Sequence, residues 1–222
     1  MLAAYLGSHH HAWLASRAST SRILADRSGP LCGSGPTSSC RRRRGPESIE
    51  WAGRKGFAIM SSGLGSPLSQ NLHSRQAYVA ALEASGHSQA EIDGLLARWV
   101  VTKHVYVAPT NAEAQAEAKG PEMWYRDAFV RSLSAEGLVG LHESVYQQAG
   151  AASARLRAQT WEELLESALL VGSPETVARK VAELDQAGVG ELACWMNFGG
   201  IRPEKARRSM RLFAQEVMPH FH

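Results

Sequence analysis

The stretch LLVGSPETVARKVAELDQAGVGELACWMNFGG, residues 169–200, decides the fold of this 222-residue chain. Its first half carries the signals of an amphipathic helix. Ser173 is a good N-cap residue, and Pro174 suits the first helical position because its missing N–H is not needed there. One apolar stripe then follows at spacings of four and three residues, formed by Val177, Val181 and Leu184.

The second half of the stretch predicts a buried strand. Gly188 is placed to end the helix, and residues 192–196 are continuously apolar, as in a parallel strand that is covered on both faces. The strand ends at the polar residue Asn197, which is followed by Gly199 and Gly200. A capped helix that leads into such a strand is the repeating unit of parallel α/β proteins.

The chain from residue 46 onward continues this alternation of helices and strands. Strand patterns rich in β-branched and aromatic residues occupy 57–60 and 99–108. A final helix has its apolar stripe at Ala206, Met210, Phe213 and Val217. Helical patterns occupy residues 46–55, 74–85, 90–97, 110–120 and, with interruptions at glycines, 121–170.

Residues 1–45 differ from the rest of the chain. The segment SGPLCGSGPTSSCRRRRG consists of turn and breaker residues without helical or strand periodicity. We therefore predict an irregular or disordered leader over residues 1–45 and a folded unit over residues 46–222.

Composition excludes several classes of function. The chain has 24 Lys and Arg against 21 Asp and Glu, and the run Arg41–Arg44 alone exceeds that excess, so no general basic field favours nucleic acid. No run approaches the ~18 apolar residues of a membrane helix. The three cysteines lack metal-ligand spacing, which predicts no metal site and favours a reducing, cytoplasmic location.

The segment VGSPETVARKVAELDQAGVGELACWMNFGG, with RRSMRLFAQEVMPHF after it, resembles the C-terminal end of the luciferase-like flavin-dependent monooxygenases of the bacterial luciferase superfamily. PESIEWAGRKGF is similar to the helix after the fifth strand of that family, and RWVVTKHVYVAPTNAEAQAEA to its seventh strand and the next helix. The resemblance implies part of a TIM-type (β/α)8 barrel, with strands six to eight and their helices. A complete barrel typically needs ~250 residues. We therefore expect this chain to correspond to the C-terminal part of the family pattern, encoded by a truncated or frameshifted copy of a gene for a full-length oxidoreductase.

The resemblance also implies a cofactor, FMN or, in some branches, the deazaflavin F420. Glu47 and Ser48 match the turn that holds the flavin phosphate, and a helix N-terminus suits an anion. Ser62 matches a position close to the cofactor. The alternatives are that Ser48 only caps its own helix and that Ser62 is an ordinary loop residue. Gly63 stands where true bacterial luciferases have tryptophan, which does not favour light emission.

Asn197 is the candidate substrate-binding residue, because the active-site side chains of barrel enzymes lie at the carboxyl ends of the strands. The alternative is that NFGG is only a tight turn. His104 alternates with apolar neighbours and is interpreted as a core residue, and no catalytic residue is assigned.

We expect a fragment of a flavin-dependent oxidoreductase or monooxygenase that acts on a small organic substrate, is inactive alone, and forms homo- or hetero-oligomers. The alternative is a non-catalytic α/β remnant or a partner subunit of another barrel chain.

Overall fold

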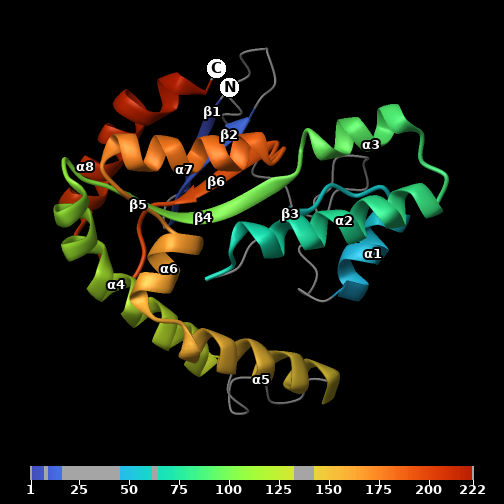
Figure 1. The fold of residues 1–222 in the computed structure, drawn as a ribbon, viewed down its shortest axis with the longest axis horizontal. Helices are drawn as coiled ribbons and strands as arrows, with labels where there is room; N and C mark the ends of the chain where they lie inside the picture. The colour runs from blue at the N-terminus through green and yellow to red at the C-terminus, as the bar shows by residue number, and fades with distance from the viewer. Residues whose placement is uncertain (1, 8–9, 17–45, 62–64, 133–142, 222) are drawn as a thin grey trace.

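The computed structural model describes residues 2–7, 10–16, 46–61, 65–132 and 143–221 (Figure 1). Its strands are β1 (Leu2–Gly7), β2 (His10–Ser16), β3 (Met60–Ser61), β4 (Val100–Val107), β5 (Leu170–Gly172) and β6 (Glu191–Trp195). Its α-helices are α1 (Pro46–Arg54), α2 (Leu68–Ala84), α3 (Gln89–Leu96), α4 (Asn111–Ser132), α5 (Glu143–Ala158), α6 (Trp161–Ser167), α7 (Pro174–Gln186) and α8 (Pro203–Leu212). A π-helical turn over Phe213–Val217 and a 3-10 turn over Met218–His220 follow α8.

Strand β4 is the centre of a parallel sheet. It pairs with β3 at Val100 and Val101, and with β6 from Val100 to His104. Beyond those residues, β4 pairs in parallel with β5 at residues 105–107. The described strands form an open sheet in the order β1-β2-β6-β4-β3, with β5 beside β4. The α/β class with a parallel sheet is therefore confirmed, and the described strands do not close into a barrel.

The prediction of an irregular leader is wrong for residues 2–7 and 10–16. These residues form the antiparallel pair β1 and β2, and β2 pairs antiparallel with β6. The sequence here lacks strict alternation, but the edge of β6 presents N–H and C=O groups that any extended segment can pair. Residues 17–45 lie outside the described part of the chain, so the boundary at residue 46 stays a prediction.

Three other boundaries differ from the predicted ones. The expected strand at 57–60 is the two-residue β3, and α2 begins at Leu68 rather than near residue 74. Strand β5 begins where the expected helical segment 121–170 ends, and the sequence patterns predict no strand there. A three-residue apolar segment carries no periodicity that distinguishes a strand from the end of a helix, so only its pairing with β4 reveals it.

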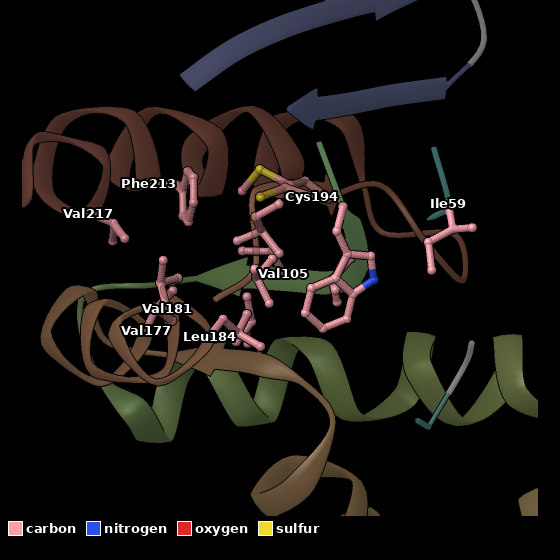
Figure 2. Packing of buried hydrophobic residues seen from close by; sticks show 14 of the residues in the cluster. Ile59, Val105, Val177, Val181, Leu184, Cys194, Phe213 and Val217 are labelled. Carbon is pink, nitrogen blue, oxygen red and sulfur yellow. The ribbon is translucent and has the colours of Figure 1, made fainter. Parts of the chain in front are cut away.

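The main core lies between one face of the sheet and the helices α1, α2, α3, α7 and α8, and Figure 2 shows part of it. Val105 of β4 and Cys194 of β6 lie on this face, and both are fully buried. The α7 stripe that the sequence predicts packs there together with Phe213 and Val217. The other face, from Tyr106 of β4, packs on small residues of α4 and on α6.

The local signals around α7 are confirmed. The Ser173 hydroxyl accepts a hydrogen bond from the backbone N–H of Thr176, and Pro174 is the first helical residue. Gly188 follows the C-terminus with φ +79, a left-handed conformation that glycine adopts without a Cβ penalty. Among the described helices, none is long and apolar enough to cross a membrane.

One buried backbone group of β4 is satisfied by a side chain instead of a strand. The pairing with β6 stops at His104, and the N–H of Val107 donates to the Ser209 hydroxyl of α8 at 2.8 Å. Ser209 is fully buried. This contact ties α8 to the central strand, because an unpaired buried N–H is unfavourable.

We expect the substitution Ser209→Ala to lower the free energy of unfolding by about 1–3 kcal/mol, because it leaves the Val107 N–H buried without an acceptor. Urea denaturation measures the change. Ser167→Ala is the matched control, since that hydroxyl is exposed and bonds only within its own helix. Equal effects of the two substitutions would contradict the role assigned to Ser209.

Candidate functional site

A buried polar pair joins β4 to α4. His104 Nδ1 and Glu122 Oε2 share a hydrogen bond of 2.7 Å, although the two residues are 18 positions apart. His104 is 7% exposed and Glu122 is fully buried. Such groups are rarely buried without a partner, so each accounts for the burial of the other.

The position of Glu122 follows from the period of α4. Ala114, Ala118 and Glu122 recur every four residues, and all three are buried on one face of that helix. The Glu122 side chain therefore lies on the same face of α4 as Ala114 and Ala118, the face that packs on the sheet. This stripe is the sequence signal that could have identified Glu122, because a carboxylate on a buried stripe requires a partner.

Aromatic rings enclose the imidazole of His104. The ring of Phe198 stacks on it with a centroid distance of 4.7 Å and an interplanar angle of 9°. Tyr125 and Trp195 approach it edge-on, at centroid distances of 5.1 and 5.3 Å. These rings keep water from the pair, and a low dielectric strengthens the hydrogen bond. The arrangement is a hydrogen bond between an imidazole and a carboxyl group, enclosed by aromatic rings.

The second carboxyl oxygen of Glu122 shows how much the residue depends on its contact with His104. Glu122 Oε1 is buried and has no hydrogen-bond partner in the described part of the chain. An unpaired carboxylate oxygen in such surroundings is unfavourable by about 1–3 kcal/mol. The contact with His104 is therefore the interaction that keeps Glu122 in place.

The loop after β6 approaches α4 closely at one glycine. A Cβ on Gly199 would lie 1.8 Å from the carbonyl oxygen of Pro121, and Gly199 has φ +57. Only glycine fits both the close contact and the left-handed backbone. The approach brings Phe198 over His104 and places Asn197 near the same end of the sheet.

A second polar group joins α4 to α8 beside this loop. The Tyr106 hydroxyl donates to Glu117 Oε2 at 2.5 Å, and Glu117 also pairs with Lys205 at 2.7 Å and Arg208 at 2.6 Å. Burial, with the Glu117 carboxylate next, raises the pKa of Tyr106. Burial opposes the ionisation of Glu117, but hydrogen bonds from Lys205 and Tyr106 hold the pKa of that carboxyl below its usual range.

Two of the site residues predicted from the sequence, Ser48 and Asn197, lie in the described part of the chain, and they belong to separate elements. Ser48 is half-buried in the first turn of α1, and the Glu47 side chain and Ser62 lie outside what the structure describes. Asn197 is half-buried after β6, and its backbone oxygen accepts a hydrogen bond from Trp195 Nε1 at 2.9 Å. Figure 1 shows α1 beside α2, on the side of the molecule away from α4 and α8. No cluster of metal-ligating side chains occurs within the described ranges.

The sequence matches a family model described as luciferase-like monooxygenase over residues 44–191. The chain belongs to this family. The resemblance that the sequence motifs indicated is thereby confirmed, and the match includes His104, Glu122 and Ser48. No curated protein matches the sequence significantly.

Solved structures of luciferase-like and related oxidoreductases share the fold. The oxygenating constituent of 3,6-diketocamphane monooxygenase from Pseudomonas putida, a type II Baeyer-Villiger monooxygenase in complex with FMN, is 24% identical with a TM-score of 0.55, covering 79% of this chain and 46% of its own. Monooxygenase RslO1 from Streptomyces bottropensis is 21% identical with a TM-score of 0.50, covering 80% and 46%. An F420-dependent secondary alcohol dehydrogenase in complex with an F420-acetone adduct is 13% identical with a TM-score of 0.52, covering 80% and 47%.

These identities establish a common fold and nothing finer. The chain spans about half the length of the solved structures that it matches. This agrees with the expectation of a partial family pattern, whereas its assignment to residues 46–222 and to the C-terminal part of the pattern stays a prediction.

We expect His104 and Glu122 to be energetically coupled by about 1–3 kcal/mol in a double-mutant cycle of His104→Ala and Glu122→Ala. The exposed pair Lys119 and Glu162, 3.5 Å apart, serves as the control and should show less than about 0.5 kcal/mol. Denaturant unfolding of the variants gives both coupling energies. Additive effects at the buried pair would show that its hydrogen bond contributes nothing to stability.

Gly199→Ala should destabilise the protein by more than Gly200→Ala. Both glycines have positive φ, +57 and +76, so both substitutions strain the backbone similarly. Only the Cβ at position 199 collides with Pro121, because nothing lies within 4 Å of the Cβ position at Gly200. Thermal unfolding compares the two variants, and an equal loss of Tm would exclude the collision as a cause.

Proposed function

We propose that this chain supplies part of the active site of a flavin-dependent oxidoreductase or monooxygenase that acts on a small organic substrate. The observation that carries the proposal is the family match over residues 44–191. FMN is bound by one of the solved relatives, and another is bound to an F420-acetone adduct. We extend this cofactor class, FMN or F420, to the present chain.

The N-terminus of α1 supports a phosphate-binding role. The first backbone N–H groups of a helix have no partner within it, and the helix dipole places partial positive charge there. Ser48, half-buried in the first turn, adds a hydroxyl donor. These residues fit the phosphate of a flavin nucleotide. Glu47 belongs to the same turn, and we propose that it contributes its backbone N–H to the phosphate.

The loop after β6 supports a role at the other end of the ligand. The Asn197 amide is half-buried and has both a donor and an acceptor, which suits a flavin edge or a substrate carbonyl. The bound cofactor supplies the redox chemistry. The residues of this chain bind and orient it, and the His104–Glu122 pair fixes the loop that carries Asn197.

The isolated chain is proposed to bind cofactor weakly and to show no turnover. Barrel active sites draw residues from the ends of several strands, and the described parallel strands form an open sheet. A ligand held from one side only loses most of the enclosure that gives a small-molecule site its affinity.

We expect FMN to bind more tightly than riboflavin, which lacks the phosphate, and we expect Ser48→Ala to weaken FMN binding by about tenfold or more. A hydrogen bond to a charged group contributes about 1.5–3 kcal/mol, and 1.4 kcal/mol corresponds to tenfold in affinity. Flavin fluorescence titration measures both differences. Ser85→Ala, at the exposed end of α2, is the control. Equal binding of FMN and riboflavin would rule out the phosphate site.

A second candidate function is that of a non-catalytic partner of another barrel chain. The observation that favours it is the edge of β3, which pairs with β4 alone among the described strands. An unpaired edge is a template for a strand of another chain. Titration of FMN with the purified protein, followed by flavin fluorescence, separates the two functions, because only a cofactor-binding protein changes that fluorescence with increasing concentration.

A further inference from the structure

Lys103 is a buried charged side chain that neither the core nor the proposed cofactor site explains. It lies on β4, on the same face as Val101 and Val105, and is 5% exposed. Its ammonium donates a hydrogen bond of 2.6 Å to the backbone oxygen of Ser66, in the loop that follows β3. Among the described residues, no carboxylate pairs with it.

The same loop has a second anchor one residue earlier. Gln159 Nε2 donates to the backbone oxygen of Gly65 at 3.0 Å, and the Gln159 backbone oxygen accepts a hydrogen bond from Arg126 of α4 at 2.8 Å. Gly65 has φ +65, and a Cβ there would lie 2.4 Å from Gln159 Oε1. Two successive loop carbonyls are thus held by side chains from distant parts of the chain.

Burying the Lys103 ammonium is energetically unfavourable. Burial, followed by the positive charge of Lys180 on α7, lowers the pKa of Lys103 to about 8. Lys180 itself is occupied, because it donates to the backbone oxygens of Leu165 and Leu169 at the end of α6. Since apolar residues of similar volume often replace buried charges without loss of stability, fold stability alone does not account for Lys103.

We propose that Lys103 is a positioning residue, whose ammonium fixes the backbone at Ser66 and thereby shapes the cofactor side of the site. The part of this inference that concerns the cofactor rests on the proposed function. The loop lies at the carboxyl end of a parallel strand, where barrel enzymes hold their ligands. Lys103 acts through the Ser66 carbonyl and does not itself touch the reacting atoms.

The pH dependence has a defined sign. The pKa of Lys103 is lower in the folded protein than the ordinary value of 10.5, so the folded state binds this proton less tightly than the unfolded state does. The contribution of Lys103 to stability is therefore unfavourable below about pH 8 and is relieved as pH rises from about 8 to 10.5. Loop anchoring has the opposite trend, because a neutral amine is a weaker donor than an ammonium.

The test compares Lys103→Met, Lys103→Arg and, as a control, Lys119→Met at an exposed lysine. Amide hydrogen exchange at Gln70 and Asn71, whose N–H groups donate to the backbone oxygen of Pro67 beside the anchored Ser66, measures loop anchoring, and urea denaturation measures global stability. We expect Lys103→Met to accelerate loop exchange by about tenfold or more without lowering global stability. Lys103→Arg should retain protection, and Lys119→Met should change neither property.

The inference would be overturned if the loop amides of a folded Lys103→Met protein exchanged at the wild-type rate. It would also be overturned if their faster exchange were fully explained by a lower global stability of the variant. If Lys103→Met does not fold, wild-type exchange at pH 7 and pH 9.5, corrected for intrinsic rates, decides instead: loop protection must fall at the higher pH. FMN titration of the same variants separates the two proposals. If loop exchange is faster in Lys103→Met but neither the wild type nor the variant binds FMN, the cofactor proposal is rejected and the positioning role stays supported. If the wild type and Lys103→Met bind FMN with equal affinity, Lys103 has no effect on the cofactor side of the site.

Discussion

The pairing of β4 along its whole length is the constraint on which the rest of the structure depends. Most of this strand is buried, so its N–H and C=O groups cannot turn to water and need partners within the protein. Strand β6 supplies them up to His104, β5 supplies them from Val105, and the Ser209 hydroxyl satisfies the N–H of Val107. The helices that follow β4 and β6 are positioned by these contacts.

The polar pair in the candidate site is part of the same framework. Glu122 contacts His104 of the central strand, and the loop after β6 is held against α4 where Gly199 meets Pro121. The Glu117 group adds a further link between α4 and α8. Because these links converge on α4, the helix and the loop that carries Asn197 are positioned together. Any ligand that enters from the carboxyl ends of the strands meets a surface set by these contacts.

Much of the fold could be predicted from local signals. The cap, stripe and terminal glycine of α7 place it correctly, and the β-branched run of β4 is recognised to within one residue at each end. Strands β2 and β5 were missed because each pairs with a strand far away in the sequence, β2 with β6 and β5 with β4, and β1 pairs only with β2. The same reason hid the His104–Glu122 pair, since its members lie on a strand and a helix. Ser48 and Asn197 could be placed on their elements, whereas their separation depends on how those elements pack.

The central claim is that β4 organises the fold, and native-state hydrogen exchange of its amides tests it most directly. The account predicts that the amides of residues 101–107 exchange only through global unfolding, with the free energy of opening equal to that from urea denaturation. Amides of β4 that exchange as rapidly as those at the end of α3 would contradict the account, because the strand would then open without the loss of the core.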